Sequence, residues 1–223
     1  MFFIKGVVFM KKNILKIVLI IILVVIVIFL INTFRKFFII QGLQENLGTY
    51  ISSTNYYMKM STIENDRTTL MTDIYKKNGN AVAIIERDNT KVSFYNNGST
   101  TDIFIEDTEG KKAELNSNAT IDFEIPDYLK TDNGWRTFCA SLFSNIKSLE
   151  IEGKEYYVLK GNLDYVFIGV PSDTKEIYIE KDTGLCLQLT HNDTIQKYEY
   201  EFDNVSDEIF IEPDVEQYEV TEK

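Results

Sequence analysis

The heptapeptide Gln196-Lys-Tyr-Glu-Tyr-Glu-Phe202 alternates apolar and polar side chains from Tyr198 onward. The stretches Ile121-Asp-Phe-Glu-Ile125 and Glu176-Ile-Tyr-Ile-Glu180 do the same. A period of two is typical of a β-strand with one face buried and the other in water. The chain beyond residue 55 is therefore predicted to be mainly β.

Turn-forming residues separate these stretches at intervals of about ten residues, as in a meander of antiparallel strands. Asn78-Gly79, Asn97-Gly98, Glu109-Gly110 and Asp182-Thr-Gly184 are examples. The spacing predicts strands at 55–64, 68–77, 80–87, 90–96, 100–106, 111–115, 119–125, 147–151, 155–161, 164–169, 175–181, 184–190 and 194–204. Because one sheet of this length must curl or split, the predicted fold is a curved antiparallel β-barrel that does not close.

One helix is expected among the strands, which makes the fold class α+β. Thr131-Asp132 can cap its N-terminus, and apolar residues follow at helical spacing. We expect this helix to cover the sheet with the stripe Trp135, Phe138, Leu142, Phe143 and Ile146.

The segment before the sheet is different in kind. Residues 14–31 are apolar except for Lys16 and would form a helix of about 27 Å, close to the hydrocarbon thickness of a bilayer. We expect a transmembrane anchor here, represented by Ile14, Ile17, Leu23, Val27 and Ile31. A cleaved signal peptide is the alternative, but the small residues of a cleavage site do not follow the apolar run.

The flanking charges predict the orientation of this anchor. Lys5, Lys11, Lys12 and Lys16 precede most of the apolar run, whereas two basic residues follow it, so the N-terminus is expected in the cytoplasm. The sequence thus predicts a single-pass signal-anchor protein of the cell membrane with an extracytoplasmic C-terminal domain. Met10 is an alternative start to Met1.

Apolar residues continue at helical spacing beyond the anchor, at Ile39, Ile40, Leu43 and Leu47. They predict an amphipathic helix over residues 35–52 that packs on the domain, with a loosely ordered stalk as the alternative. We divide the chain into residues 1–36, the cytoplasmic tip and anchor, and residues 37–223, one extracytoplasmic domain.

The charge of this domain limits its partners. All 34 acidic residues but only 17 of the 23 basic residues follow Lys36, which gives the domain a net charge of −17. Such a domain should not bind nucleic acid, and it should stand off an anionic membrane surface.

We find no pattern of catalytic or metal-ligating residues and expect no enzyme and no cofactor. The only histidine, His191, lies in a turn sequence, and the separation of Cys139 and Cys186 matches no metal site. The two cysteines either form a disulfide or remain buried thiols. The many carboxylates match no calcium loop.

A resemblance comes from the C-terminal part of the chain. The hairpin Glu176-Ile-Tyr-Ile-Glu-Lys-Asp-Thr-Gly-Leu185, followed by Tyr198–Val205 and Ile211-Glu-Pro-Asp214, resembles membrane-anchored proteins of low-GC Gram-positive bacteria. Those proteins are similar to the lipoprotein-carrier superfamily, which includes LolA, LolB and LppX. Cys186 stands where a proline is common in these relatives, which alters the start of a strand but not the turn.

The resemblance implies an unclosed barrel whose concave apolar face can hold acyl chains. It does not imply shuttling between membranes, because this chain is expected to be tethered by its own span. We therefore expect a binding module of the cell envelope for a lipid or another hydrophobic ligand. The candidate cavity residues are Tyr56, Met58, Met60, Phe138 and Leu142. The alternative is a docking or sensor module that binds an envelope protein and has no ligand cavity.

Overall fold

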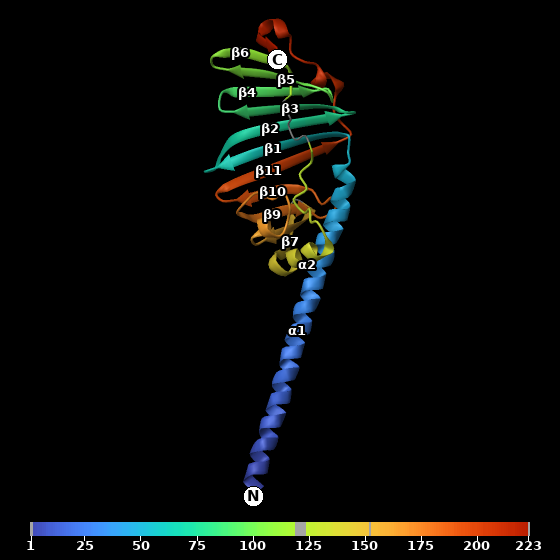
Figure 1. Ribbon diagram of the computed structural model, residues 1–223, viewed down its shortest axis with the longest axis vertical. Coiled ribbons are helices and arrows are strands. Elements are labelled where there is room, and N and C mark those ends of the chain that lie inside the picture. The colour runs from blue at the N-terminus through green and yellow to red at the C-terminus, as the bar shows by residue number, and fades with distance from the viewer. Residues whose placement is uncertain (1, 119–123, 152, 223) are drawn as a thin grey trace.

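The computed structural model describes residues 2–118, 124–151 and 153–222. A 50-residue helix, α1 (Phe2–Ile51), leads into one open sheet of twelve strands (Figure 1). The strands are β1 (Asn55–Glu64), β2 (Arg67–Lys77), β3 (Asn80–Arg87), β4 (Thr90–Asn96), β5 (Thr101–Asp107), β6 (Gly110–Ser117), β7 (Asn145–Ile151), β8 (Lys154–Lys160), β9 (Thr174–Glu180), β10 (Cys186–His191), β11 (Thr194–Phe202) and β12 (Glu219–Glu222).

The sheet consists of two antiparallel meanders, β1–β6 and β7–β11, which are joined where β1 pairs with β11. In this junction Met58 lies opposite Tyr200 and Met60 opposite Tyr198. The short β12 adds to β6 in parallel, so β12 and β7 form the two edges. The predicted class is confirmed: the fold is mainly β, and the sheet does not close.

Two-residue turns set the register of the hairpins. Asn65-Asp66 connects β1 to β2, and Asn78-Gly79 connects β2 to β3, with positive φ at all four residues. These dihedral angles match the right-handed twist of the flanking strands. Strands predicted at 55–64, 80–87 and 90–96 have the observed bounds, and most others differ by one to three residues.

Two strand predictions need comment. The strand predicted at 164–169 is wrong, because Leu163, Val166 and Phe167 are buried at helical spacing and Leu163–Tyr165 forms the 3-10 helix η1. The strand predicted at 119–125 lies mostly on residues outside the described part of the chain. β12 was not predicted.

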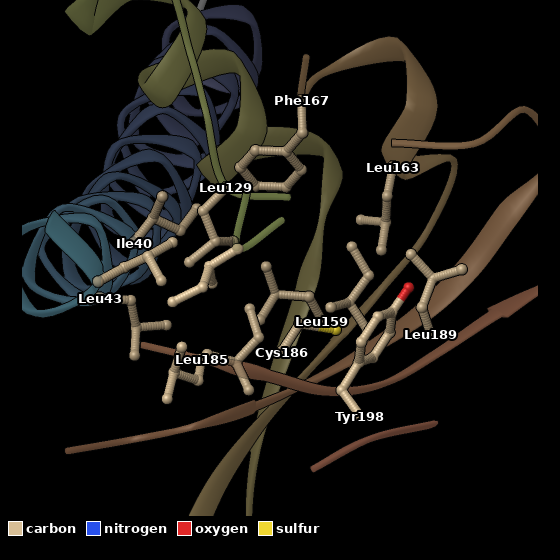
Figure 2. Close-up of a cluster of buried hydrophobic side chains, with 14 of the residues drawn as sticks. Ile40, Leu43, Leu129, Leu159, Leu163, Phe167, Leu185, Cys186, Leu189 and Tyr198 are labelled. Atoms are coloured by element: carbon tan, nitrogen blue, oxygen red, sulfur yellow. The ribbon is translucent and has the colours of Figure 1, made fainter. Parts of the chain in front are cut away.

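The C-terminal half of α1 belongs to the core, as its amphipathic pattern predicts. Ile40, Leu43 and Leu47 are buried, together with Ile125 and Leu129 from the segment that leads to the second helix. Figure 2 shows Ile40, Leu43, Leu129, Leu185 and Cys186 among the side chains of this cluster. Because α1 is continuous, no stalk separates its apolar half from the sheet.

The second helix, α2 (Gly134–Phe143), packs against α1 where α1 reaches the sheet (Figure 1). Its cap is Asn133, whose side chain accepts a hydrogen bond from the Arg136 amide. Small residues form its buried face, namely Thr137, Ala140 and Ser141. The predicted stripe is therefore only partly buried: Trp135 and Phe143 are exposed, Phe138 and Leu142 are half-buried, and Ile146 lies in β7.

Candidate functional site: a groove along the long helix

The five candidate cavity residues lie in two places. Tyr56 and Met58 are buried and Met60 is half-buried on one face of β1, where Ile125, Leu129 and α1 fill the space above the sheet. The other two residues lie on α2, and the ring of Phe138 stacks on Trp135 with centroids 5.6 Å apart. The structure does not bring the two groups into one cluster. A ligand site at these five residues stays a prediction.

An open groove of about 610 Å³ lies on another side of α1. One wall is the α1 segment between Arg35 and Asn46, and the other comes from β8 and from the turn after β9. Its lining residues are Arg35, Phe38, Ile39, Gly42, Leu43, Asn46, Tyr157, Lys181 and Asp182. We call this space the α1 groove.

A smaller hollow of about 140 Å³ shares Arg35, Ile39 and Tyr157 with the α1 groove. It reaches Asn32 and Lys36 on α1 and Ser148 on β7. The two spaces together follow α1 from Asn32 to Asn46, so they begin one residue after the end of the apolar run.

Two glycines explain why one side of α1 is packed and the next is open. At Gly184, in the turn between β9 and β10, an added Cβ would lie 2.3 Å from the carbonyl oxygen of Leu43. This turn therefore touches the backbone of α1. At Gly42, by contrast, an added Cβ would meet nothing within 4 Å. Gly42 keeps the groove open because a larger side chain there would occupy it.

Polar contacts close the end of the groove farthest from the apolar run. The Asn46 side chain donates a hydrogen bond to the Lys181 carbonyl over 3.2 Å. Lys181 Nζ lies 2.5 Å from Glu155 Oε2 and 5.9 Å from the centre of the Tyr157 ring. The hydrogen bond to Glu155 raises the pKa of Lys181, so this amine stays charged. The lining thus combines the apolar side chains of Phe38 and Ile39 with Arg35 near one end and with Asn46, Lys181 and Asp182 at the other.

A second groove of about 370 Å³ lies over β9–β11 beside the end of α1. Tyr198, Tyr200 and Phe202 stack along it with centroids 6.3 and 6.4 Å apart. The Tyr200 hydroxyl donates to the Cys186 carbonyl, and Tyr50 packs against Phe202. Because their own contacts hold these rings, this groove is less open to a ligand than the α1 groove.

The cysteines are free thiols in the structure, with Cys186 buried in the core and Cys139 half-buried on α2. Burial raises the pKa of the Cys186 thiol, which disfavours the thiolate that nucleophilic chemistry needs. Among the residues whose placement is described, no group of three or more His, Cys, Asp or Glu side chains could hold a metal ion.

The first half of α1 is long and apolar enough to cross a membrane, and the side chains of residues 15–32 are exposed in the folded chain. A core helix of a soluble protein would bury such residues. A membrane anchor and a signal sequence share the observed properties.

No protein-family model matches the chain, and no curated protein does. A crystal structure of a LolA superfamily protein from Nitrosomonas europaea is similar over 77% of this chain and 97% of that chain, with 9% sequence identity and a TM-score of 0.25. It belongs to the superfamily that the hairpin resembles, but so low a TM-score supports no functional argument. A Gram-positive origin stays a prediction.

Sequence reasoning missed the α1 groove because its walls are far apart in the chain. In the sequence, Arg35 and Phe38 follow the end of the apolar run, and Lys181-Asp182 has the composition of an ordinary turn. Neither segment by itself indicates a groove. The one local signal is Gly42, a poor helix former within an amphipathic helix. In a helix interior such a glycine suggests that space is needed at its Cα.

Proposed function

We propose that the chain is a membrane-tethered binding module whose α1 groove takes a lipid or another hydrophobic ligand. In this proposal α1 is a single-pass anchor with a cytoplasmic N-terminus, and the sheet lies outside the cytoplasm. One observation carries the proposal: the α1 groove and the smaller hollow that adjoins it start beside Asn32, on the same unbroken helix whose apolar run ends at Ile31. A ligand could enter it from the bilayer with little exposure to water.

The chemistry of the lining suits an amphiphile. Phe38 and Ile39 offer apolar surface, and the exposed Arg35 offers a positive charge near the membrane end. The volume of about 610 Å³ falls in the range of sites that bury a small organic ligand. An acyl chain with an anionic or zwitterionic headgroup fits both features, because the chain can contact the apolar wall while the headgroup reaches a cation.

A docking role is the second candidate, and the β7 edge of the sheet favours it. β7 pairs only with β8 in the observed strand order, and Leu149 and Ile151 on it are exposed. An exposed edge with apolar side chains can pair with a strand of another protein. The filled space over β1 also agrees with this role.

Photocrosslinking in native membranes tests the first proposal. Membranes that contain a phospholipid with a photoreactive acyl chain are irradiated, and the crosslinked peptides of the full chain are identified by mass spectrometry. Crosslinks to residues 35–46 and to the peptide with Tyr157 are expected, besides those to residues 15–31. The crosslinks to residues 15–31 serve as the internal standard for insertion.

Two glycines on α1 provide a matched pair of variants. Gly42→Phe should fill the groove and reduce its crosslinks about tenfold relative to the standard, since a filled site cannot admit the chain. Gly48→Phe is the control, because an added Cβ at Gly48 also meets nothing within 4 Å and Gly48 does not line the groove. Crosslinks confined to residues 15–31 in the wild type would reject the lipid site and favour the docking role.

A further inference from the structure

Large aromatic side chains are exposed at one end of the domain. Trp135 on α2 is 72% exposed, Phe143 at the end of α2 is 71% exposed, and Tyr165 in η1 is 78% exposed. Phe34 on α1 is exposed as well. We call these four residues the aromatic patch. Water-exposed aromatic clusters of this kind mark surfaces that contact a protein or a membrane.

Contacts between the elements hold this patch together. The ring of Phe138 bridges Trp135 and Phe34, with centroid distances of 5.6 and 6.2 Å. Phe143 and Tyr165 line a shared hollow of about 430 Å³. Arg136 Nε donates to the Val166 carbonyl over 3.0 Å, which ties α2 to the segment after η1. The patch is therefore one surface that spans three elements.

The helix geometry fixes the height of this surface relative to the apolar run. Phe34 follows Ile31 by three residues, a rise of about 5 Å along α1. The headgroup region extends about 5–8 Å beyond the hydrocarbon core on each side. α2 lies at the same level, because Thr33 is buried and Lys36 Nζ donates to the Ser144 carbonyl over 2.8 Å.

The charges at this end differ from those of the whole domain. Arg35, Lys36 and Arg136 lie beside the patch, with Asp132 at 3.8 Å from Arg136 and Asp164 in η1 as the acidic neighbours. This local excess of cations tolerates anionic lipid, although the domain as a whole is strongly acidic.

We propose that the aromatic patch rests in the headgroup region of the bilayer that α1 spans and so seats the sheet upright on the membrane. Trp and Tyr favour this region because their rings are apolar and their N–H and O–H groups can still reach water. The partner is thus the lipid surface and not a second protein. The inference rests on the proposed anchoring by α1.

Trp135 is the only tryptophan of the chain, so its fluorescence reports directly on the patch. The full chain is reconstituted into phosphatidylcholine–phosphatidylglycerol vesicles that carry bromine near the headgroup end or near the methyl end of the acyl chains. We expect headgroup-end bromine to quench Trp135 by about half and methyl-end bromine to quench it much less, as for a residue at the interface.

A distal reporter is the matched control. Ile211 is 71% exposed and follows η2 (Asp207–Phe210), which packs on β3 away from α2. In a W135F background, I211W should show no quenching by either lipid. The double variant F143S/Y165S changes only exposed side chains, so it should reduce the quenching of Trp135 and leave the melting temperature unchanged.

Flotation of the vesicles separates the outcomes. Chain that floats and shows quenched Trp135 supports the inference. Chain that floats with Trp135 as unquenched as I211W overturns the inference and leaves the proposed anchor intact. Chain that does not float overturns both, since α1 would then not be inserted.

Discussion

Gly184 is the residue at which the hairpin after β9 meets α1. Its φ of +73° lies in the left-handed region, and an added Cβ would lie 2.3 Å from the Leu43 carbonyl oxygen and 2.9 Å from Leu47 Cβ. We expect Gly184→Ala to lower the free energy of unfolding by about 2–4 kcal/mol, because the left-handed backbone and the overpacking each cost about 1–2 kcal/mol or more. Urea unfolding of the full chain in a mild detergent measures this loss.

Gly79 is the control for this substitution. It has a φ of +90° in the turn between β2 and β3, and an added Cβ there meets nothing within 4 Å. Gly79→Ala should therefore show only the backbone cost of about 1–2 kcal/mol. Equal losses for both variants would mean that the contact between Gly184 and α1 is not tight.

The same residue shows what the sequence could predict and what it could not. The Asp182-Thr-Gly184 turn was predicted from residue types alone, since a tight turn with positive φ favours glycine. Its contact with Leu43 was not predictable, because nothing local in the sequence pairs a turn with a helix so far away in the chain. The α1 groove depends on that same pairing, which is why its residues were missed.

At the scale of elements, β12 depends on a few side-chain contacts. Tyr218, just before β12, packs its ring against Phe104 with centroids 5.1 Å apart, and its hydroxyl donates a hydrogen bond to Glu106 on β5. Hydrogen bonds from Tyr218 and Lys111 lower the pKa of Glu106, while burial and the Glu106 contact raise the pKa of Tyr218 to about 12.

These shifts predict how the docking of β12 changes with pH. A carboxyl group whose pKa is lowered by folding stabilises the folded state above its ordinary pKa, and this stabilisation is lost as the pH falls through the lowered value. The hydrogen-exchange protection of β12 should therefore decrease on acidification before that of β3 and β4. Tyr218→Phe should reduce the protection of β12 at neutral pH and weaken its pH dependence. A pH dependence identical to that of the wild type would show that Glu106 does not hold β12.

Elements bounded by clear turn signals were predicted well, and those that depend on distant contacts were not. The spacing of the turn residues gave β1, β3 and β4 with their observed bounds. β12 has four residues and adds to the edge at β6, so its formation depends on the Tyr218 contacts. In α2 the apolar stripe predicted burial, but the small side chains of Ala140 and Ser141 allow close packing and leave Trp135 exposed. Trp135 and Phe143, which the stripe predicted to be buried, thereby become part of the aromatic patch.

For the whole molecule, α1 is both the apolar helix and part of the core of the sheet domain. The domain boundary predicted between residues 36 and 37 stays a prediction, and α1 continues across it without a break. A force or tilt on the apolar half of α1 is therefore transmitted to Ile40, Leu43 and Leu47, which the sheet and the segment before α2 enclose.

This arrangement predicts that the sheet cannot fold without the C-terminal half of α1. Ile40, Leu43 and Leu47 are at most 2% exposed, and burying each such side chain stabilises the fold by about 1.5–3 kcal/mol. Their combined loss of about 5–9 kcal/mol is comparable with the whole stability of a typical domain, about 5–15 kcal/mol. A fragment of residues 53–223 should therefore lack fixed tertiary structure, whereas a fragment of residues 32–223 should fold and unfold cooperatively. Near-ultraviolet circular dichroism and urea titration of the two fragments measure the difference. Cooperative unfolding of residues 53–223 would show that the sheet folds without α1. The α1 groove would then lie between an independently folded domain and a helix that its folding does not require.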